Sequence, residues 1–293
     1  MQLKYSFKKE WYHFTRTFRL GGILIAVFSF ALADPLMYKA LGALMQMAAE
    51  VDMDSLMATA SAGVQVTSAD YGYYDYSGMT DVFFDGGAVL GVALAEICSS
   101  AFLVIMLLLM SAAGGEQKKR ATIIPSCSGL NTFNYLLPKF VIYPAFVLVV
   151  SFAGSAVSGV LCSVLFTQNV PSMGMMLFGA LLCGIYMAFL TAVYLSVGLC
   201  TSRPGVTTVL MYIGVSVVKL ILSSLDLTMY NPFTLSLLIS GEMFAEGFSL
   251  ADNAASIIVA VVLSAVIGVL MFLLALAVQR AKAINNQEDR PEF

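Results

Sequence analysis

The sequence contains unusually little charge. Only 11% of its 293 residues are Asp, Glu, Lys or Arg, whereas 59% are hydrophobic and the mean hydropathy is +0.87. Soluble domains have about 25% charged and about 45–50% apolar residues, so this is not a soluble globular protein. No stretch longer than about fifty residues lacks a long apolar run, which excludes an appended catalytic domain of ordinary size. We therefore expect a polytopic membrane protein.

Residues that bind metals or hydrolyse bonds are scarce. His13 is the single histidine, which excludes a multi-histidine metal site and an HExxH protease. The dipeptide Gly-Lys does not occur, so the chain has no GxxxxGK[ST] phosphate loop, and we expect no catalytic activity in the chain itself. The cysteines share no CxxC spacing, which favours small packing residues over a disulfide or metal framework: Cys98, Cys127, Cys162, Cys183 and Cys200.

Six segments are long and apolar enough to cross about 30 Å of hydrocarbon as helices, which takes about 20 residues. Their length and lack of polar alternation favour helices over barrel strands. The predicted fold is an all-α polytopic membrane protein with one transmembrane domain over 1–293. Small residues such as Gly87, Gly91 and Gly154 are expected to let helices approach closely. The spans are expected at about 20–41 (broken late by Asp34-Pro35), 86–115, 140–166, 173–200, 205–225 and 254–279.

The basic residues are concentrated on one side of this arrangement. With six crossings, both termini and the 116–139 and 200–205 loops share a side that holds 13 of the 15 bases: Lys4, Lys8, Lys9, Arg16, Arg19, Lys118, Lys119, Arg120, Lys139, Arg203, Arg280, Lys282 and Arg290. Cytoplasmic loops carry such an excess of Lys and Arg. Both termini are therefore predicted to be cytoplasmic, with 42–85 and 226–252 extracellular.

The first nineteen residues interleave aromatic and basic side chains. This composition is typical of a helix at the membrane interface, with rings in the headgroup zone and cations toward anionic lipid. A merely basic flank to the first span is the alternative.

The long loop at 116–139 is more apolar than a simple linker. Ile123-Ile124-Pro125 and Tyr135-Leu136-Leu137 predict a short amphipathic helix under the membrane that returns to span three through Pro138-Lys139. Such a helix is either a docking surface for a soluble motor or a simple membrane-lying helix, and physical arguments leave both open.

The chain resembles ABC-2 type transporter permeases in this loop and in the order of its elements. The matching residues are Gly115-Glu116, Lys118-Lys119-Arg120, Thr122, Ile124-Pro125-Ser126, Lys139-Phe140, and, elsewhere, Asp34-Pro35, Ser202-Arg203 and Asn231-Pro232-Phe233. The loop departs from the family pattern in lacking a basic residue at its Pro125-Ser126-Cys127-Ser128-Gly129 turn.

The resemblance implies an exporter of the bacterial cytoplasmic membrane. Two permease chains, the same or different, would assemble with two copies of an ABC ATP-binding subunit that binds ATP and Mg. Residues 1–19 would be the elbow helix, and spans two and five would line the pathway. No nucleic acid is expected as a partner. The coupling helix that contacts the ATPase would include Glu116, Lys118, Lys119, Arg120, Ile123, Ile124 and Pro125.

Three charges fall inside the predicted spans. A charge within a span costs about 2.5–3.5 kcal/mol on insertion scales, so Lys219, Glu96 and Asp34 each need a partner, a cavity or a route to the interface. All three lie at outer depth, and we predict that Lys219 pairs with Glu96 or Asp34. An outer gate or a contact to an anionic substrate group is the functional interpretation. Snorkelling to the outer headgroups is the alternative.

The expected function is that of an ATP-driven export permease. The spans are rich in Met, Phe, Leu, Ala and Ser, so an apolar or amphipathic cargo (a peptide, drug or lipid-like molecule) fits better than a free ion. An ion-gradient-driven transporter or channel is the alternative, although it usually shows an internal repeat or several intramembrane acids. A membrane anchor or sensor partner of an ATPase is a third class. An enzyme in its own right is least favoured.

Overall fold

The computed structural model describes residues 2–50, 85–115, 131–201, 203–225, 230–244 and 248–288. Helices make up nearly all of these residues, and no β-strand occurs among them beyond one isolated bridge between Asp85 and Gln168. The predicted all-helical class is confirmed for this part of the chain.

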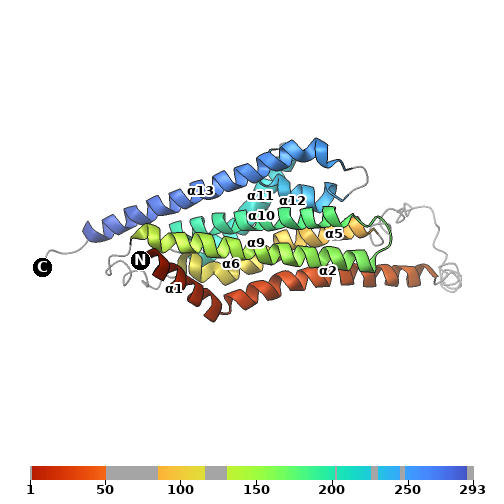
Figure 1. Ribbon diagram of the computed structural model, residues 1–293, viewed down its shortest axis with the longest axis horizontal. Coiled ribbons are helices and arrows are strands. Elements are labelled where there is room, and N and C mark those ends of the chain that lie inside the picture. Colours follow the sequence, from red (N-terminus) through yellow and green to blue (C-terminus); the bar gives the residue numbers. More distant parts are fainter. Residues whose placement is uncertain are drawn as a thin grey trace, which may run out of the picture.

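The helices form an elongated bundle (Figure 1). Within the described residues, six helices are long and apolar enough to span a membrane, as predicted. The second of these is built from four pieces, two of which are π-helical turns. The elements are α1 (Gln2–Arg16), α2 (Arg19–Glu50), α5 (Gly86–Glu96), η1 (Ile97–Ala101), α6 (Phe102–Met110), η2 (Ser111–Gly115), α9 (Thr132–Leu165), α10 (Met173–Cys200), α11 (Pro204–Ser224), α12 (Thr234–Leu237), η3 (Leu238–Glu242) and α13 (Leu250–Glu288).

Several helices begin at residues whose chemistry favours a helix start. The Asp85 carboxylate accepts hydrogen bonds from the backbone amides of Gly87 (2.8 Å) and Ala88 (3.0 Å), which caps α5. Side chains of Asn131 and Ser172 cap α9 and α10 in the same way. These caps satisfy amides that an apolar environment would otherwise leave unpaired.

Two predicted boundaries are corrected. Span one is not broken at Asp34-Pro35, because α2 runs through Pro35 without interruption to Glu50. Span three begins at Thr132 rather than near 140, and Pro138 lies inside α9. The apolar residues at 135–137 are therefore the first turns of span three and not part of a separate helix. Membrane-spanning helices accommodate proline because neighbouring groups satisfy the freed carbonyls.

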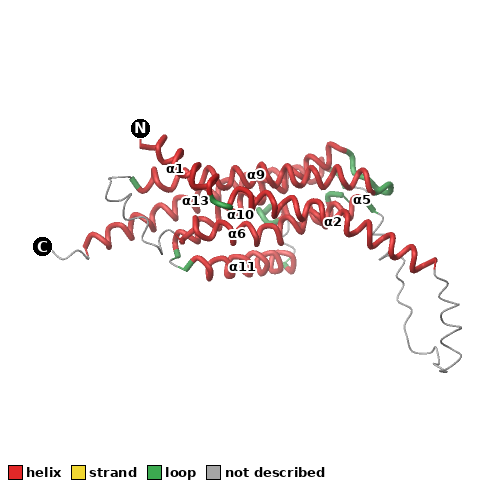
Figure 2. Tube along the Cα trace, turned by 90° about the horizontal axis from the view of Figure 1, so that it is seen from below, coloured by secondary structure: helices red, strands yellow, loops and turns green. Residues whose placement is uncertain are grey.

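Helices α9 and α10 lie at the centre of the bundle. They pack along each other, α2 packs on α9, and α13 packs on α10 (Figure 1). Helix α11 lies at the edge and contacts mainly α6 and α10 (Figure 2). The end of the bundle that carries α1 also holds the last turns of α10 and α13, and we call it the α1 end (Figure 1).

Small residues set the closest helix crossings, as predicted. A methyl group built on Gly154 of α9 would lie 2.5 Å from Cγ1 of Val27 on α2. One built on Gly91 of α5 would lie 2.8 Å from the carbonyl oxygen of Ser240 in η3. The η3 turn therefore packs directly against span two, and Ile239 is completely buried there.

The tightest contact at the α1 end joins α10 to η2. A methyl group on Gly198 would lie 2.5 Å from Cβ of Ala113 and 3.0 Å from its carbonyl oxygen. The carbonyl oxygen of Gly198 in turn lies against Gly114. The end of span two is thus held by backbone contact with span four.

We expect Gly198→Ala to destabilise the protein by about 1–3 kcal/mol, because overpacking a close helix contact forces the backbones apart. The measurement is the thermal unfolding midpoint in detergent micelles. Gly214→Ala on α11 is the matched control, since nothing lies within 4 Å of the added methyl group. An unchanged midpoint for Gly198→Ala would contradict the proposed close contact.

Candidate functional site

The residues of the predicted coupling helix lie outside the described residues. These are Glu116, Lys118, Lys119, Arg120, Ile123, Ile124 and Pro125. The segment 116–130 is nevertheless flanked on both sides by described structure. The described chain before it ends with η2, and the described chain after it begins with Asn131, which caps α9. The two elements that flank this segment are η2 on its N-terminal side and the start of α9 on its C-terminal side, and we call them its first and second anchors. The candidate site is built from these two anchors and from the charges inside the bundle.

Arg19 joins the first anchor to three other helices. Its side chain is only 6% exposed, and its guanidinium donates to Ser111 Oγ in η2 (2.5 Å) and to Tyr143 Oη in α9 (2.7 Å). A further hydrogen bond of 3.2 Å joins the guanidinium to Nδ1 of His13 on α1. Because guanidinium carries several donors in a fixed fork, one arginine can hold α1, α2, α9 and η2 together.

Tyr143 completes this polar cluster. Its hydroxyl donates to the Glu10 carboxylate of α1 (2.6 Å) while accepting from Arg19, so the phenol bridges an acid and a base. Phe14 packs edge-to-face on the same ring with centroids 5.2 Å apart, and on Phe146 at 4.8 Å. These contacts fix α1 to span three by one aromatic and one charged interaction.

Lys139 holds the second anchor. It is completely buried in α9, its ammonium lies 4.7 Å from the centre of the Tyr135 ring, and it reaches the carbonyl oxygen of Ala112 in η2 at 3.5 Å. The contact between Lys139 and Ala112 therefore joins η2, which precedes 116–130, to α9, which follows it. Arg19 and Lys139 both act on the π-helical turn that ends span two.

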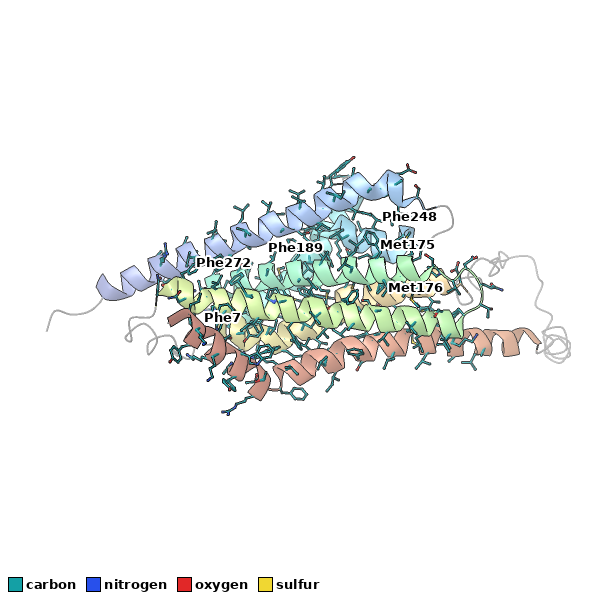
Figure 3. All side chains as sticks on the ribbon, in the orientation of Figure 1. Phe7, Met175, Met176, Phe189, Phe248 and Phe272 are labelled. Atoms are coloured by element: carbon teal, nitrogen blue, oxygen red, sulfur yellow. The ribbon has the colours of Figure 1, made fainter. Side chains whose placement is uncertain are left out.

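Span six, formed by α13, contacts the C-terminus of α10 at the α1 end of the bundle. Gln279 and Lys282 of α13 donate to the carbonyl oxygens of Leu199 (2.6 Å) and Cys200 (2.9 Å), which are the last of α10. Cations near a helix C-terminus are favourable because the terminal carbonyls carry partial negative charge. Phe272 adds apolar contacts, with its ring 5.0 Å from that of Phe140 on α9 (Figure 3).

The outer face of α1 is basic and aromatic. Glu10, its only acid, is buried in the polar cluster, so the exposed side chains include bases but no acid. Tyr12 lies between two cations, with Lys8 Nζ 5.8 Å and Arg16 Cζ 5.6 Å from its ring centre. Trp11 is 48% exposed. This face has the composition expected for a helix at a lipid interface.

The predicted ion pair of Lys219 is not present. Its ammonium lies 5.2 Å above the centre of the Tyr186 ring on α10. Among the described residues, neither Glu96 nor Asp34 forms a salt bridge with it. The structure instead brings Lys219 of span five against spans two and four.

The two intramembrane acids lie near each other. Glu96 is the last residue of α5 and accepts a 2.5 Å hydrogen bond from Ser100 in η1. Asp34 on α2 is 7% exposed, interacts electrostatically with Glu96, and its Oδ2 atom has no hydrogen-bond partner among the described residues. Both acids thus lie on helices of spans one and two that pack against each other.

Sequence reasoning missed the polar cluster. Arg19 and Glu10 were counted only as charges, although a lone acid within a basic helix was a usable signal. Tyr143 carries no such signal, because a tyrosine in an apolar run is typical of an ordinary core residue. Lys139 was included in the family resemblance but had no assigned partner.

No group of three or more His, Cys, Asp or Glu side chains that could hold a metal lies within the described part of the chain. Cys98 and Cys183 are in contact, with their sulfur atoms 3.5 Å apart, and both are free thiols. No family model, curated protein or solved structure matches this chain. The function is therefore inferred from the residues themselves.

We expect Tyr143→Phe to lower the free energy of unfolding by about 1–3 kcal/mol, because the change leaves the buried Glu10 and Arg19 without their shared hydroxyl. Thermal unfolding in detergent micelles measures the effect. Tyr5→Phe on α1 is the control, since Tyr5 is 70% exposed and should change stability by less than about 0.5 kcal/mol. Equal midpoints for the two variants would show that the cluster does not stabilise the fold.

Proposed function

We propose that the chain is the permease subunit of an ATP-driven exporter of the ABC-2 type. In this proposal it moves an apolar or amphipathic molecule across the bacterial cytoplasmic membrane. A separate ATP-binding subunit, present in two copies, supplies the energy, and a second permease chain completes the pathway. The N- and C-termini lie in the cytoplasm.

The charge distribution supports this orientation. The α1 end of the bundle carries Arg16, Arg203 and Arg280, together with both anchors of the basic 116–130 segment. An excess of bases on one side is typical of the cytoplasmic face. An ATP-binding subunit would reach the protein from this side.

The observation that carries the proposal is the anchoring of 116–130. Arg19 holds Ser111 on the outgoing side, and Lys139 contacts the carbonyl of Ala112 from the returning helix. A docking segment transmits force only if its ends are attached to the elements that must move. Here both ends are attached to spans one, two and three, and through Tyr143 to α1.

Span two then provides a path from this segment into the membrane. Its π-helical turns η1 and η2 interrupt an otherwise regular helix, and such turns are common at functional sites because they deform more easily than α-helix. We infer that ATP binding by the partner displaces 116–130, that η2 passes the displacement to span two, and that η1 and α6 pass it on to α11, which packs on α6. This coupling requires two conformations of the permease. ATP binding shifts the equilibrium toward one of them only if the ATP-bound partner makes more favourable contacts with that conformation.

An ion-gradient-driven transporter is the second candidate. The observation in its favour is the electrostatic interaction between buried Asp34 and half-buried Glu96, with Asp34 Oδ2 lacking a hydrogen-bond partner among the described residues. Intramembrane acids of this kind mark ion or proton pathways in many transporters. A protein that purifies alone, without ATPase activity, would favour this candidate.

The decisive prediction concerns the partner. Affinity purification of the chain from its host in mild detergent should recover an ATP-binding subunit and ATP hydrolysis. A variant with Lys118, Lys119 and Arg120 changed to Glu, and Ile123 and Ile124 changed to Ala, should lose the subunit and reduce hydrolysis at least about tenfold, because charge and apolar contacts are removed together.

The matched control reverses the same number of charges at the same end of the bundle. Lys4→Glu, Arg203→Glu and Arg280→Glu change exposed residues with no role in the proposed docking. This control should retain the subunit, which separates loss of docking from altered membrane topology. Retention of the subunit by both variants would place the docking surface elsewhere.

A native thiol reports the orientation. Cys98, Cys162 and Cys183 are buried, whereas Cys127 belongs to the proposed cytoplasmic segment. In a Cys200→Ser background, which removes the described cysteine that is partly exposed, a membrane-impermeant maleimide should label the protein in inside-out vesicles and leave it unlabelled in intact cells, with Cys127→Ser removing the signal. Labelling of Cys127 in intact cells would reverse the proposed orientation.

A further inference from the structure

Lys219 lies on the face of α11 that packs against the bundle. Met211, Tyr212 and Val215 are the partly buried residues of α11 that contact the core, and Lys219 follows Val215 by four residues. Residues four apart share a helix face. The lysine therefore continues the inward stripe. The exposed side of α11 carries no charge and is mainly apolar, with Val206, Val209, Leu210, Ile213, Val217, Leu220 and Ile221 beside two serines.

This inward position leaves a cation without a carboxylate. Glu96 bonds to Ser100, Asp34 faces Glu96, and the described residues include no other acid that pairs with Lys219. A tyrosine ring compensates a charge only partly, since cation–π attraction is weaker than an ion pair. A charge in a span requires compensation, and no carboxylate among the described residues supplies it for Lys219.

The surroundings of Lys219 have the character of a binding site. Tyr186 is completely buried, and its hydroxyl has no partner at hydrogen-bond distance among the described residues. The nearby Ser236 hydroxyl donates to the carbonyl of Phe233 (2.9 Å). One turn later, Phe189 lies on the side of α10 that faces α12 and α13 (Figure 3). Its ring packs edge-to-face on Phe233 with centroids 6.0 Å apart.

We propose that Lys219 and Tyr186 bind the anionic group of an amphiphile, with Phe189 and Phe233 contacting its apolar part. The ligand chemistry is one carboxylate, phosphate or similar anion joined to an apolar body. This inference rests on the proposed export function, and it assigns the substrate class: the cargo is an anionic amphiphile recognised between spans two, four and five.

Two sources supply this chemistry, a transported solute and an anionic lipid of the bilayer. The experiment separates them by the composition of the membrane. The purified chain is placed in phosphatidylcholine nanodiscs, and its thermal unfolding midpoint is followed on addition of dodecyl phosphate or of dodecanol, its uncharged analogue. Selective binding to the folded state raises the midpoint with ligand concentration.

Dodecyl phosphate should raise the wild-type midpoint and dodecanol should not. Lys219→Met should weaken the apparent affinity for dodecyl phosphate at least about tenfold, because the ion pair is lost, and Lys219→Arg should retain it. Lys39→Met is the matched control. That lysine also lies over an aromatic ring, 5.5 Å from the centre of Phe166, but it is exposed on span one. It should bind as wild type does.

The ligand-free midpoint tests a purely structural role. An unpaired cation destabilises the fold, so Lys219→Met should be as stable as wild type or more so. A lower midpoint for Lys219→Met, or an equal response of Lys219→Met and wild type to dodecyl phosphate, overturns the proposal.

The final arm uses nanodiscs that contain phosphatidylglycerol. If a solute is the ligand, dodecyl phosphate still raises the wild-type midpoint in these discs. If phosphatidylglycerol itself occupies the site, these discs raise the wild-type midpoint before any ligand is added, and dodecyl phosphate raises it no further. Both effects should disappear in Lys219→Met. This outcome would assign the site to a lipid and contradict a solute cargo. None of these measurements involves ATP, so failure to find an ATP-binding subunit leaves their result unaffected.

Discussion

The buried guanidinium of Arg19 is the interaction on which the α1 end of the structure depends. An isolated charge at this position would be costly, and the cost is offset because Ser111, Tyr143 and His13 accept its hydrogen bonds. Each acceptor belongs to a different helix. Satisfying one charge therefore fixes α1, span two and span three in a single arrangement. Polar groups inside an apolar bundle restrict its geometry in this way, because the packing must satisfy each of them.

Lys219 presents the opposite situation. It is a cation on an inward helix face that lies over the Tyr186 ring and has no carboxylate partner among the described residues. The same physical rule that makes Arg19 structural makes Lys219 a candidate ligand contact, since a charge that the fold does not satisfy must be satisfied by something else. The two residues lie toward opposite ends of the bundle, and span two contacts both. The proposed exporter would connect energy input at one end to cargo binding at the other through this span.

The helices approach closely only where side chains are small. Gly198 lets α10 contact η2 through backbone atoms, and Gly91 does the same for α5 and η3. These contacts support span two next to its π-helical turns, where its own hydrogen bonding is less regular. In the proposed exporter, this close packing would favour a displacement along span two rather than into the surrounding core.

The sequence by itself determined the six spans and their class, because crossing hydrocarbon requires about 20 apolar residues and satisfied backbone groups. It also indicated small packing residues and the concentration of bases on one side. It did not predict that α2 continues through Pro35 or that α9 starts at Thr132, because a proline's effect depends on neighbours that can satisfy the freed carbonyls. The partners of Arg19, Lys139 and Lys219 were decided only by tertiary structure. Charge and hydropathy give the depth of a residue along its helix, whereas the face it presents and the helix it meets depend on how the whole bundle packs.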